Sequence, residues 1–365
     1  MYDLERIAED QARFARCVAE AQPYAPLLVK IKLTWRCNLR CVMCNIWRQQ
    51  RHELLSLDRL RALADELADL GTRKVHLSGG ETLLRPDLFD LVAYLSDKGM
   101  RVNLTTNGTL LTPERAERLV EAGVRGVSIS VDSPDRKVHD RIRGVAGAWK
   151  RTVRGIRALR RVVDRHRAKV RLRINTVITR RNYTSLNRLA AFAHEEGVDR
   201  LTLIPVDDPT GQLRLNKTRI RDFNGRVAPV LAEEGVAWGL FQTPEEAYPF
   251  GRTGRELEYS KLGEYARGLY RRQPCYAPWT HAFITPRGRV HACCMTRGAR
   301  PLGDLRVQSF REVWKGTSYR ALRVAMRDGH LYPACHRCDD FLQANRFLHR
   351  LADGRGEAFD VRRGR

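Results

Sequence analysis

Strands and helices alternate six times along the first two thirds of the chain, and this order restricts the fold more than any other feature. Apolar strands are predicted at 27–33, 74–80, 101–108, 126–132, 170–179 and 200–206. A helix is predicted after each of them, at 57–70, 86–98, 112–123, 149–165, 184–196 and 217–234. Such alternation predicts a parallel sheet covered by helices. Because no Rossmann glycine pattern accompanies the six units, we expect an α/β fold, a partial (β/α)6 barrel of TIM type, with its chemistry at the carboxyl ends of the strands.

The points where this alternation starts and stops predict four regions. An amphipathic helix lies in 1–26, the partial barrel spans 27–240, and a small α+β domain spans 241–350. Within that small domain we expect a β-hairpin at 278–294 and a helix at 309–326. The last segment, 351–365, ends in "VRRGR" and is predicted to be a basic tail.

Charge and hydropathy exclude several classes of protein. No stretch approaches the roughly 18 consecutive apolar residues that span a bilayer, and the charged N-terminus lacks the apolar core of a secretory signal. We therefore expect a cytoplasmic protein with no membrane partner. The net charge of +24 is compatible with a nucleic-acid partner. Its arginines are scattered over nearly every predicted helix, however, so we do not expect nucleic acid to bind.

Three cysteines follow the first strand, in "WRCNLRCVMCNIW" at 35–47. In the cytosol, clustered cysteines are more often metal-bound or catalytic than paired in disulfides. A structural zinc site usually takes four ligands, and this stretch offers no fourth. Three thiolates on one short loop also suit an iron–sulfur cluster that leaves one iron free for another ligand. From these cysteines alone, zinc and iron–sulfur both remain open.

The spacing Cys37-x3-Cys41-x2-Cys44 resembles that of the radical S-adenosylmethionine (radical SAM) superfamily. The resemblance implies a [4Fe–4S] cluster on these three cysteines, with SAM chelating the fourth iron. It implies reductive cleavage of SAM to a 5′-deoxyadenosyl radical that abstracts hydrogen from the substrate, and an external electron donor of flavodoxin or ferredoxin type. Met43 departs from the pattern, because an aromatic residue usually precedes the last cysteine.

The ends of the later strands agree with this resemblance. "SGGET" at 78–82 resembles the glycine–glycine–glutamate turn that meets the amino group of SAM. "TTNG", "SISVD" and "HDRIRG" follow at 105–108, 128–132 and 139–144. The resemblance implies that Asp132 binds a ribose hydroxyl and that Arg143 binds the SAM carboxylate. The complete set of implied SAM contacts is Gly79, Gly80, Glu81, Thr106, Asn107, Ser130, Asp132, Arg143, Asn175 and Ile204.

A second group of cysteines lies in the C-terminal region. Cys275, Cys293, Cys335 and Cys338 resemble the auxiliary-cluster extension called SPASM, or its shorter form, twitch. Four thiolates would hold a second [4Fe–4S] cluster, although four cysteines also make a zinc ribbon. Only five cysteines follow residue 240, too few for the two clusters of the full SPASM pattern. The fifth, Cys294, is either a packed thiol, a replacement ligand or a hydrogen donor to a substrate radical.

The resemblance implies several classes of reaction. We expect first the oxidation of a carbinol carbon on a small polar substrate, an aminocyclitol or aminosugar from natural-product biosynthesis. In this prediction the auxiliary cluster receives the second electron, and Asp207 and Asp208 in "PVDDP" face a cationic substrate. The alternatives are epimerisation of a sugar, with Cys294 as the catalytic hydrogen donor, and modification of a ribosomal peptide. The segment before the first strand looks too short for a leader-binding domain, which favours a small substrate.

Overall fold

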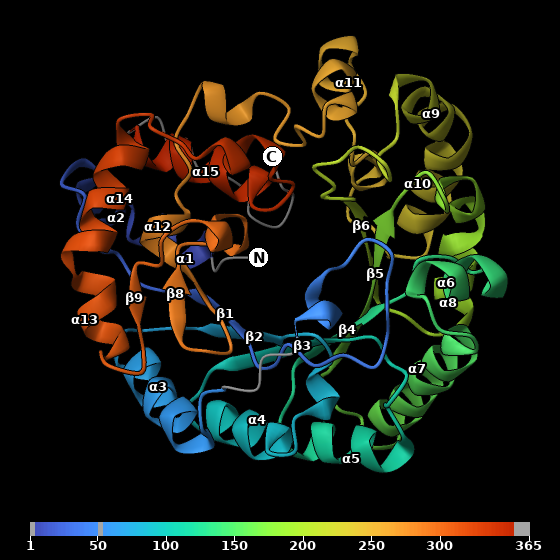
Figure 1. Ribbon diagram of the computed structural model, residues 1–365, viewed down its shortest axis with the longest axis horizontal. Helices are drawn as coiled ribbons and strands as arrows, with labels where there is room; N and C mark the ends of the chain where they lie inside the picture. The colour runs from blue at the N-terminus through green and yellow to red at the C-terminus, as the bar shows by residue number, and fades with distance from the viewer. Residues whose placement is uncertain (1–3, 50–53, 354–365) are drawn as a thin grey trace.

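A computed structural model describes residues 4–49 and 54–353, and its centre is a parallel sheet with helices packed around the outer face (Figure 1). The six predicted strands are all present and parallel to their neighbours. They are β1 (Leu28–Lys32), β2 (Lys74–Ser78), β3 (Arg101–Thr106), β4 (Gly126–Ser130), β5 (Arg171–Ile178) and β6 (Arg200–Pro205). β6 is an edge strand, so the sheet is open, and the prediction of a partial barrel is confirmed.

Helices follow the strands as predicted and bury one apolar stripe each against the sheet. Their bounds are α3 (Leu57–Asp69), α4 (Leu88–Asp97), α5 (Pro113–Glu121), α7 (Ala148–Arg165), α8 (Leu189–Glu195) and α10 (Ala228–Ala237). Ser56 caps α3 by accepting a hydrogen bond from the Arg59 N–H at 3.2 Å, which satisfies one free N–H of the first turn. In Figure 1 these helices follow one another around the outside of the sheet.

Several predicted helices are interrupted or preceded by tighter turns. The N-terminal helix divides at Asp10 into α1 (Leu4–Glu9) and α2 (Gln11–Ala19). The segment 184–196 begins as a 3₁₀ turn before α8, and a π-turn separates α9 (Lys217–Asp222) from α10. An unpredicted helix, α6 (Arg136–Arg143), contains most of "HDRIRG" and ends at Gly144, which adopts φ +69°. Only glycine takes this left-handed conformation without cost.

The two faces of the sheet differ sharply in polarity. Alternate residues such as Val75, Leu77 and Val102 are buried and face the helices. The residues between them, including Lys30, His76 and Asn103, lie on the inner face, and the strand register aligns Lys30 with His76. The inner face of this barrel is therefore polar along most of its length, as expected for a binding surface rather than for a packed core.

The C-terminal region extends the same sheet. β7 (His281–Ile284) runs parallel to β1, and β8 (Arg289–His291) and β9 (Gly303–Asp304) continue in antiparallel order. The predicted hairpin is thus present, and it makes the sheet nine-stranded. The remaining helices are α11 (Gly254–Lys261), α12 (Ala277–Thr280), α13 (Phe310–Lys315), α14 (Thr317–Arg327) and α15 (Leu342–Ala352). The sequence predicts a separate small domain here, and in the structure the strands of this region pair directly with the barrel sheet.

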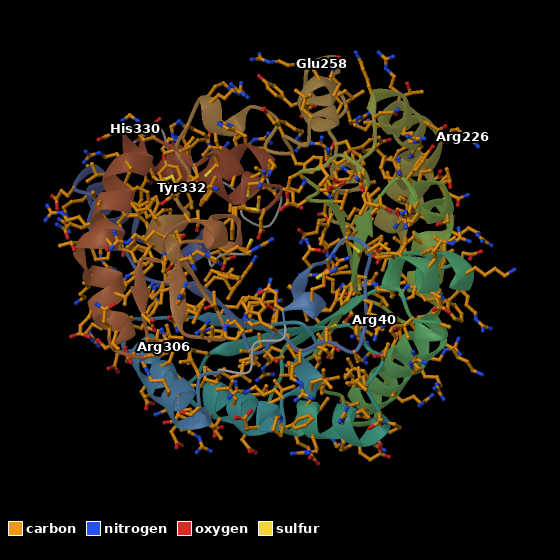
Figure 2. All side chains as sticks on the ribbon, viewed as in Figure 1. Arg40, Arg226, Glu258, Arg306, His330 and Tyr332 are labelled. Atoms are coloured by element: carbon orange, nitrogen blue, oxygen red, sulfur yellow. The ribbon has the colours of Figure 1, made fainter. Side chains whose placement is uncertain are left out.

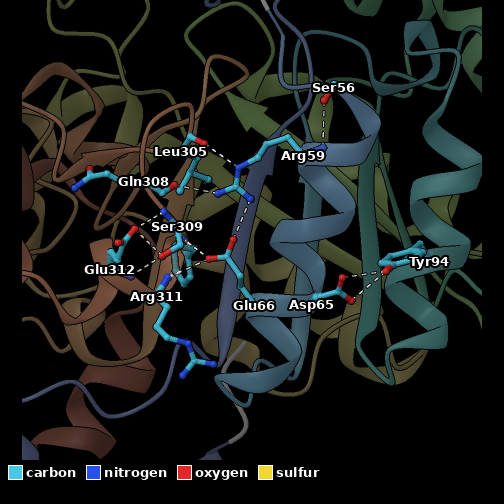
Figure 3. A network of polar contacts seen from close by, with 11 residues as sticks. Ser56, Arg59, Asp65, Glu66, Tyr94, Leu305, Gln308, Ser309, Arg311 and Glu312 are labelled. Atoms are coloured by element: carbon cyan, nitrogen blue, oxygen red, sulfur yellow. Dashed lines mark hydrogen bonds and ion pairs between the residues drawn. The ribbon is translucent and has the colours of Figure 1, made fainter.

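A polar network also ties the C-terminal region to α3 (Figure 3). The Arg59 guanidinium donates to the backbone carbonyls of Leu305 at 2.8 Å and Gln308 at 3.1 Å, and it pairs with Glu66 at 3.0 Å. Glu66 in turn accepts from the backbone N–H groups of Phe310 and Arg311 at the start of α13. A carboxylate at a helix N-terminus is stabilised by the free N–H groups there.

Only part of the predicted basic tail, 351–365, lies within the described residues. α15 continues through residues 351 and 352, and the rest of the predicted tail, 354–365, lies outside the described residues. Within the described part of the chain, no helix combines the length and the apolar character that crossing a bilayer would require.

Candidate functional site

The loop of the barrel cysteines, Cys37, Cys41 and Cys44, packs on the glycine turn that ends β2. The Gly80 N–H donates to the Thr34 carbonyl, and the Glu81 N–H donates to the Arg36 carbonyl, each at 2.8 Å. A Cβ atom on Gly80 would lie 2.2 Å from the Arg36 oxygen. The backbone approach therefore requires glycine at this position. Gly79 makes a similar approach to Thr34, so both glycines shape the cysteine loop.

Glu81 is fully buried, and its carboxylate joins the β2 and β3 turns. It accepts from the Leu83 N–H at 3.0 Å, the Thr106 hydroxyl at 2.6 Å and the Asn107 N–H at 2.7 Å. Burial raises the pKa of this carboxyl, and the hydrogen bonds oppose the rise. The Asn107 side chain continues the network by donating to Asn38, inside the cysteine loop, at 2.8 Å. The predicted residues Glu81, Thr106 and Asn107 are thus brought together beneath the cysteines.

The barrel cysteines receive hydrogen bonds suited to thiolates. The Leu39 N–H donates to the Cys37 sulfur at 3.5 Å, and the Arg143 guanidinium donates to the Cys41 sulfur at 3.8 Å. Burial raises the pKa of the free Cys37 thiol to about 11. Burial also raises the pKa of Cys41, and the charge of Arg143 acts against that rise. Metal ligation would supply the further stabilisation that these thiolates need.

Asp132 and Arg143, predicted as separate SAM contacts, form a buried ion pair. The Arg143 Nε lies 2.8 Å from the Asp132 Oδ2, and their side chains are 8% and 0% exposed. The other carboxylate oxygen of Asp132 accepts from the Val177 N–H at 3.0 Å. Because each charge already has a partner, the pair holds the Cys41 side of the loop against the β4 and β5 strand ends.

The other predicted SAM contacts lie on the inner face of the sheet. The register places Ser130 opposite Asn175 on adjacent strands, and Ile204 opposite Val177. Ser130, Asn175 and Ile204 are all half-buried. The structure therefore brings these three residues to the carboxyl end of the barrel, where the cysteine loop also lies.

The C-terminal cysteines, Cys275, Cys293, Cys335 and Cys338, lie together. Burial raises the pKa of Cys275, Cys293 and Cys335 to about 12 and that of Cys338 well above its ordinary range. In each case the charge of at least one other cysteine adds to the rise. Four sulfurs from distant parts of the chain thus lie near enough to act on one another electrostatically, and three of them are buried while Cys293 is half-buried. Figure 2 marks Tyr332, whose carbonyl accepts from the Cys335 N–H at 2.8 Å.

Asn345 on α15 supports this group and was not predicted from the sequence. Its amide donates to the Cys275 sulfur at 3.6 Å and to the Tyr270 hydroxyl at 2.8 Å. Its side-chain oxygen accepts from the Tyr276 N–H at 2.8 Å, and the residue is fully buried. An asparagine on the apolar face of an amphipathic helix was the available sequence signal, but only the fold pairs it with Cys275.

Cys294 lies between the C-terminal cysteines and the inner face of β1. The charges of Lys30, Asp339, Asp340 and Arg297 all act on its thiol, whose pKa is raised by burial. Lys30 pairs with Asp340 at 2.5 Å, and its ammonium lies 5.0 Å from the Phe341 ring centre. The ion pair joins β1 to the segment that follows Cys338. Cys294 therefore lies at the boundary between the barrel and the C-terminal region.

Lys32, two residues after Lys30 on the same face, was also missed by sequence reasoning. Cys44 and Cys294 both act electrostatically on its ammonium, so it lies between Cys44 of the barrel loop and Cys294. Burial lowers its pKa, and within the described ranges it makes no ion pair. The alternation "VKIKL" was the available signal, since lysines two apart on a predicted strand share a face.

The two predicted substrate residues have different surroundings. Asp208 accepts from the Thr210 hydroxyl at 2.6 Å and from the Leu213 N–H at 2.6 Å, and therefore holds its own loop. Asp207 is exposed and lies 3.4 Å from the Arg337 Nε of the C-terminal region. Both follow β6, as predicted, and both have protein partners.

These features define a class of enzyme with an open α/β barrel and two groups of buried or half-buried cysteines. Three thiolates with N–H donors aimed at two of them fit a cluster with one iron left for another ligand. Four clustered thiolates with a buried amide donor fit a second cluster. The sequence profile of the radical SAM superfamily matches residues 31–202, and that of the SPASM iron–sulfur cluster-binding domain matches residues 275–339.

Comparisons with known proteins support this class. The AdoMet-dependent heme synthase of Methanosarcina barkeri is 32% identical over 324 residues, which is 83% of this chain and 86% of that protein. The mycofactocin maturase MftC of Mycobacterium tuberculosis H37Rv is 30% identical over 322 residues, 87% of this chain and 76% of that protein. The structure of Streptococcus suis SuiB bound to S-adenosylmethionine is similar in fold, with a TM-score of 0.65 and 18% identity. The match covers 92% of this chain and 77% of SuiB.

The chain belongs to the radical SAM superfamily and carries a C-terminal SPASM-type domain. It is a radical SAM enzyme, and its cofactors are SAM and two iron–sulfur clusters, as the sequence predicts. Cys37, Cys41 and Cys44 would hold the first cluster, and Cys275, Cys293, Cys335 and Cys338 the second. SAM and the barrel cluster, when bound, supply a radical able to take hydrogen from an unactivated carbon.

Proposed function

We propose that this enzyme oxidises a substrate that carries carboxylate groups and binds on the inner face of the barrel, between the two groups of cysteines. The observation that carries the proposal is the unpaired ammonium of Lys32. Lys30 beside it already has Asp340 as a partner, whereas Lys32 has no ion pair within the described residues. Lys32 is half-buried, and a charge withdrawn from water is costly unless an opposite charge accompanies it. A substrate carboxylate would supply that charge.

The charge of the inner face argues against the expected cationic aminosugar as first candidate. Lys30, Lys32 and Arg297 are grouped around Cys294. The acids expected to attract a cation, Asp207 and Asp208, already have partners. A cationic aminocyclitol would have to approach the unpaired Lys32 ammonium against repulsion, because Asp340 neutralises only Lys30. Carbinol oxidation and epimerisation through Cys294 remain predictions about the reaction, independent of this argument about charge.

The relatives suggest two kinds of carboxylate-bearing substrate. The match to the AdoMet-dependent heme synthase extends over most of both chains, so we propose a porphyrin with carboxylate side chains as the first candidate. A peptide is the second candidate, favoured by the similarity to the PqqA peptide cyclase of Bradyrhizobium diazoefficiens over 86% of this chain. In both cases Lys32 would orient the carboxylate, and the inner face would hold the reacting carbon towards the barrel cysteines.

The test uses anaerobically purified enzyme with reductant, SAM and one candidate substrate at a time. The candidates are a polycarboxylate porphyrin, a peptide ending in a free carboxylate, and an aminocyclitol. Product mass distinguishes loss of hydrogen, loss of carbon dioxide with hydrogen, and no change. Conversion of the porphyrin or the peptide supports the proposal. Conversion of the aminocyclitol alone would overturn it in favour of the cationic substrate.

A lysine variant tests the carrying observation directly. Lys32→Met should raise the substrate KM by roughly tenfold or more, the worth of a hydrogen bond to a charged group, and should leave the KM for SAM unchanged. Lys315→Met on the exposed face of α13 is the matched control. If Lys32→Met instead lowers SAM cleavage in the absence of substrate, Lys32 serves the cluster and not the substrate.

A further inference from the structure

A cavity of about 1080 Å³ lies at the amino-terminal ends of the barrel strands. Its lining includes the first residues of β2 to β6, whereas the cysteine loop lies at the opposite, carboxyl ends of the strands. It is therefore separate from the radical site. Its volume lies slightly above the usual range for small-molecule sites, ~300–1,000 Å³.

The lining of this cavity is strongly cationic. Eight lysines and arginines face one acid, Asp199. Asp199 accepts from the Leu172 N–H at 2.6 Å and lies 3.6 Å from Arg160. Arg200 has its own partner, Glu246, at 3.0 Å. The other six cations form no ion pair with any described residue: Lys74, Arg101, Arg125, Lys169, Arg171 and Arg173.

The strand register forces several of these charges together. Lys74 is aligned with Arg101 on the adjacent strand, and Arg173 is aligned with Arg200. Like charges directly opposite each other in a sheet are destabilising. The Arg173 Nε is buried and has no hydrogen-bond acceptor. Burial and the neighbouring arginines lower the pKa of Lys74 to about 8. A bound anion would relieve each of these costs.

We propose that this cavity binds a small polyanion with several phosphate groups, either an inorganic oligophosphate or the phosphate chain of a nucleotide. A guanidinium group binds phosphate oxygens through two parallel hydrogen bonds, and four of the six unpaired cations are arginines. Several close cations match a ligand that concentrates several charges in a small volume. Arg101, Arg125, Lys169 and Arg171 are exposed, and Lys74 and Arg173 are half-buried. The charges gather around one cavity rather than along a whole face, so a small ligand fits better than a nucleic-acid duplex.

Isothermal calorimetry on the full-length holoenzyme tests this proposal with tripolyphosphate, at constant ionic strength. We expect saturable binding with one site per chain. Arg101→Ala/Arg171→Ala, which changes two exposed residues of the lining, should weaken it by about tenfold or more per arginine. Arg226→Ala is the matched control, since Arg226 is 80% exposed at the periphery (Figure 2). ATP and adenosine then distinguish an inorganic oligophosphate from a nucleotide as the ligand. If the ligand is a nucleotide, ATP should bind at least as tightly as tripolyphosphate.

The outcome does not depend on the proposed substrate, because binding is measured directly. Equal affinity in the lining variant and the control would overturn the proposal, as would equal binding of citrate and tripolyphosphate. Circular dichroism and iron content check that the variant is folded. If it is not, Lys169→Ala alone, on the exposed loop before β5, serves as the second variant, with the same requirement of weaker binding.

Discussion

Replacing Asp132 with asparagine removes the negative member of the buried pair beside Cys41. The Arg143 guanidinium would then remain charged in a place where its side chain is only 8% exposed. Removing one member of a buried ion pair costs about 3–5 kcal/mol, because the other charge is left without compensation. At about 2 °C per kcal/mol for a long chain, the Tm of Asp132→Asn should fall by roughly 6–10 °C.

Calorimetry of the anaerobic holoenzyme measures this shift, and a surface pair provides the control. Asp69 and Arg311 are 69% and 45% exposed and pair at 3.2 Å. Asp69→Asn should cost at most about 1 kcal/mol, as exposed pairs do. The double variant Asp132→Asn/Arg143→Met should recover much of the lost stability, since no unpaired charge remains. A loss below about 1 kcal/mol in Asp132→Asn, or a double variant as unstable as the sum of both changes, would refute the reasoning.

Three further predictions concern the cysteines and the docking of the C-terminal region. Replacing Cys37, Cys41 and Cys44 with alanine should remove about half of the iron and all SAM cleavage; full iron content in that variant contradicts the assignment. Cys294→Ala should still form product if the reaction is an oxidation without a hydrogen donor; loss of turnover with iron content intact, and solvent deuterium in the wild-type product, would instead indicate epimerisation. Arg59→Ala should lower the free energy of unfolding by about 2–3 kcal/mol, because it removes a half-buried cation from two carbonyls and from Glu66. Arg61→Ala, whose partner Asp58 is 92% exposed, should change it little in the same urea titration.

Local sequence patterns were sufficient for the barrel and for the identity of the cysteines. Apolar periodicity, a serine at a helix start and a glycine at a helix end all depend on neighbours within a few residues. The six strands and the helices between them could therefore be predicted from the sequence. The spacing of Cys37, Cys41 and Cys44 carries its information within eight residues. The short helix α6 was missed, because its arginines and histidine give no clear apolar stripe.

Tertiary structure alone determined which charges neutralise each other. Asp132 and Arg143 each looked like a ligand contact, yet the ends of β4 and α6 bring them within 2.8 Å. Lys30 and Asp340 are 310 residues apart and meet because β7 pairs with β1. The cations of the amino-terminal cavity come from four strands, from the loops before β4 and β5, and from α7. Sequence periodicity specifies the face on which a side chain lies, but strand order and register between distant segments decide which partner stands opposite it, and hence which charges remain for a ligand.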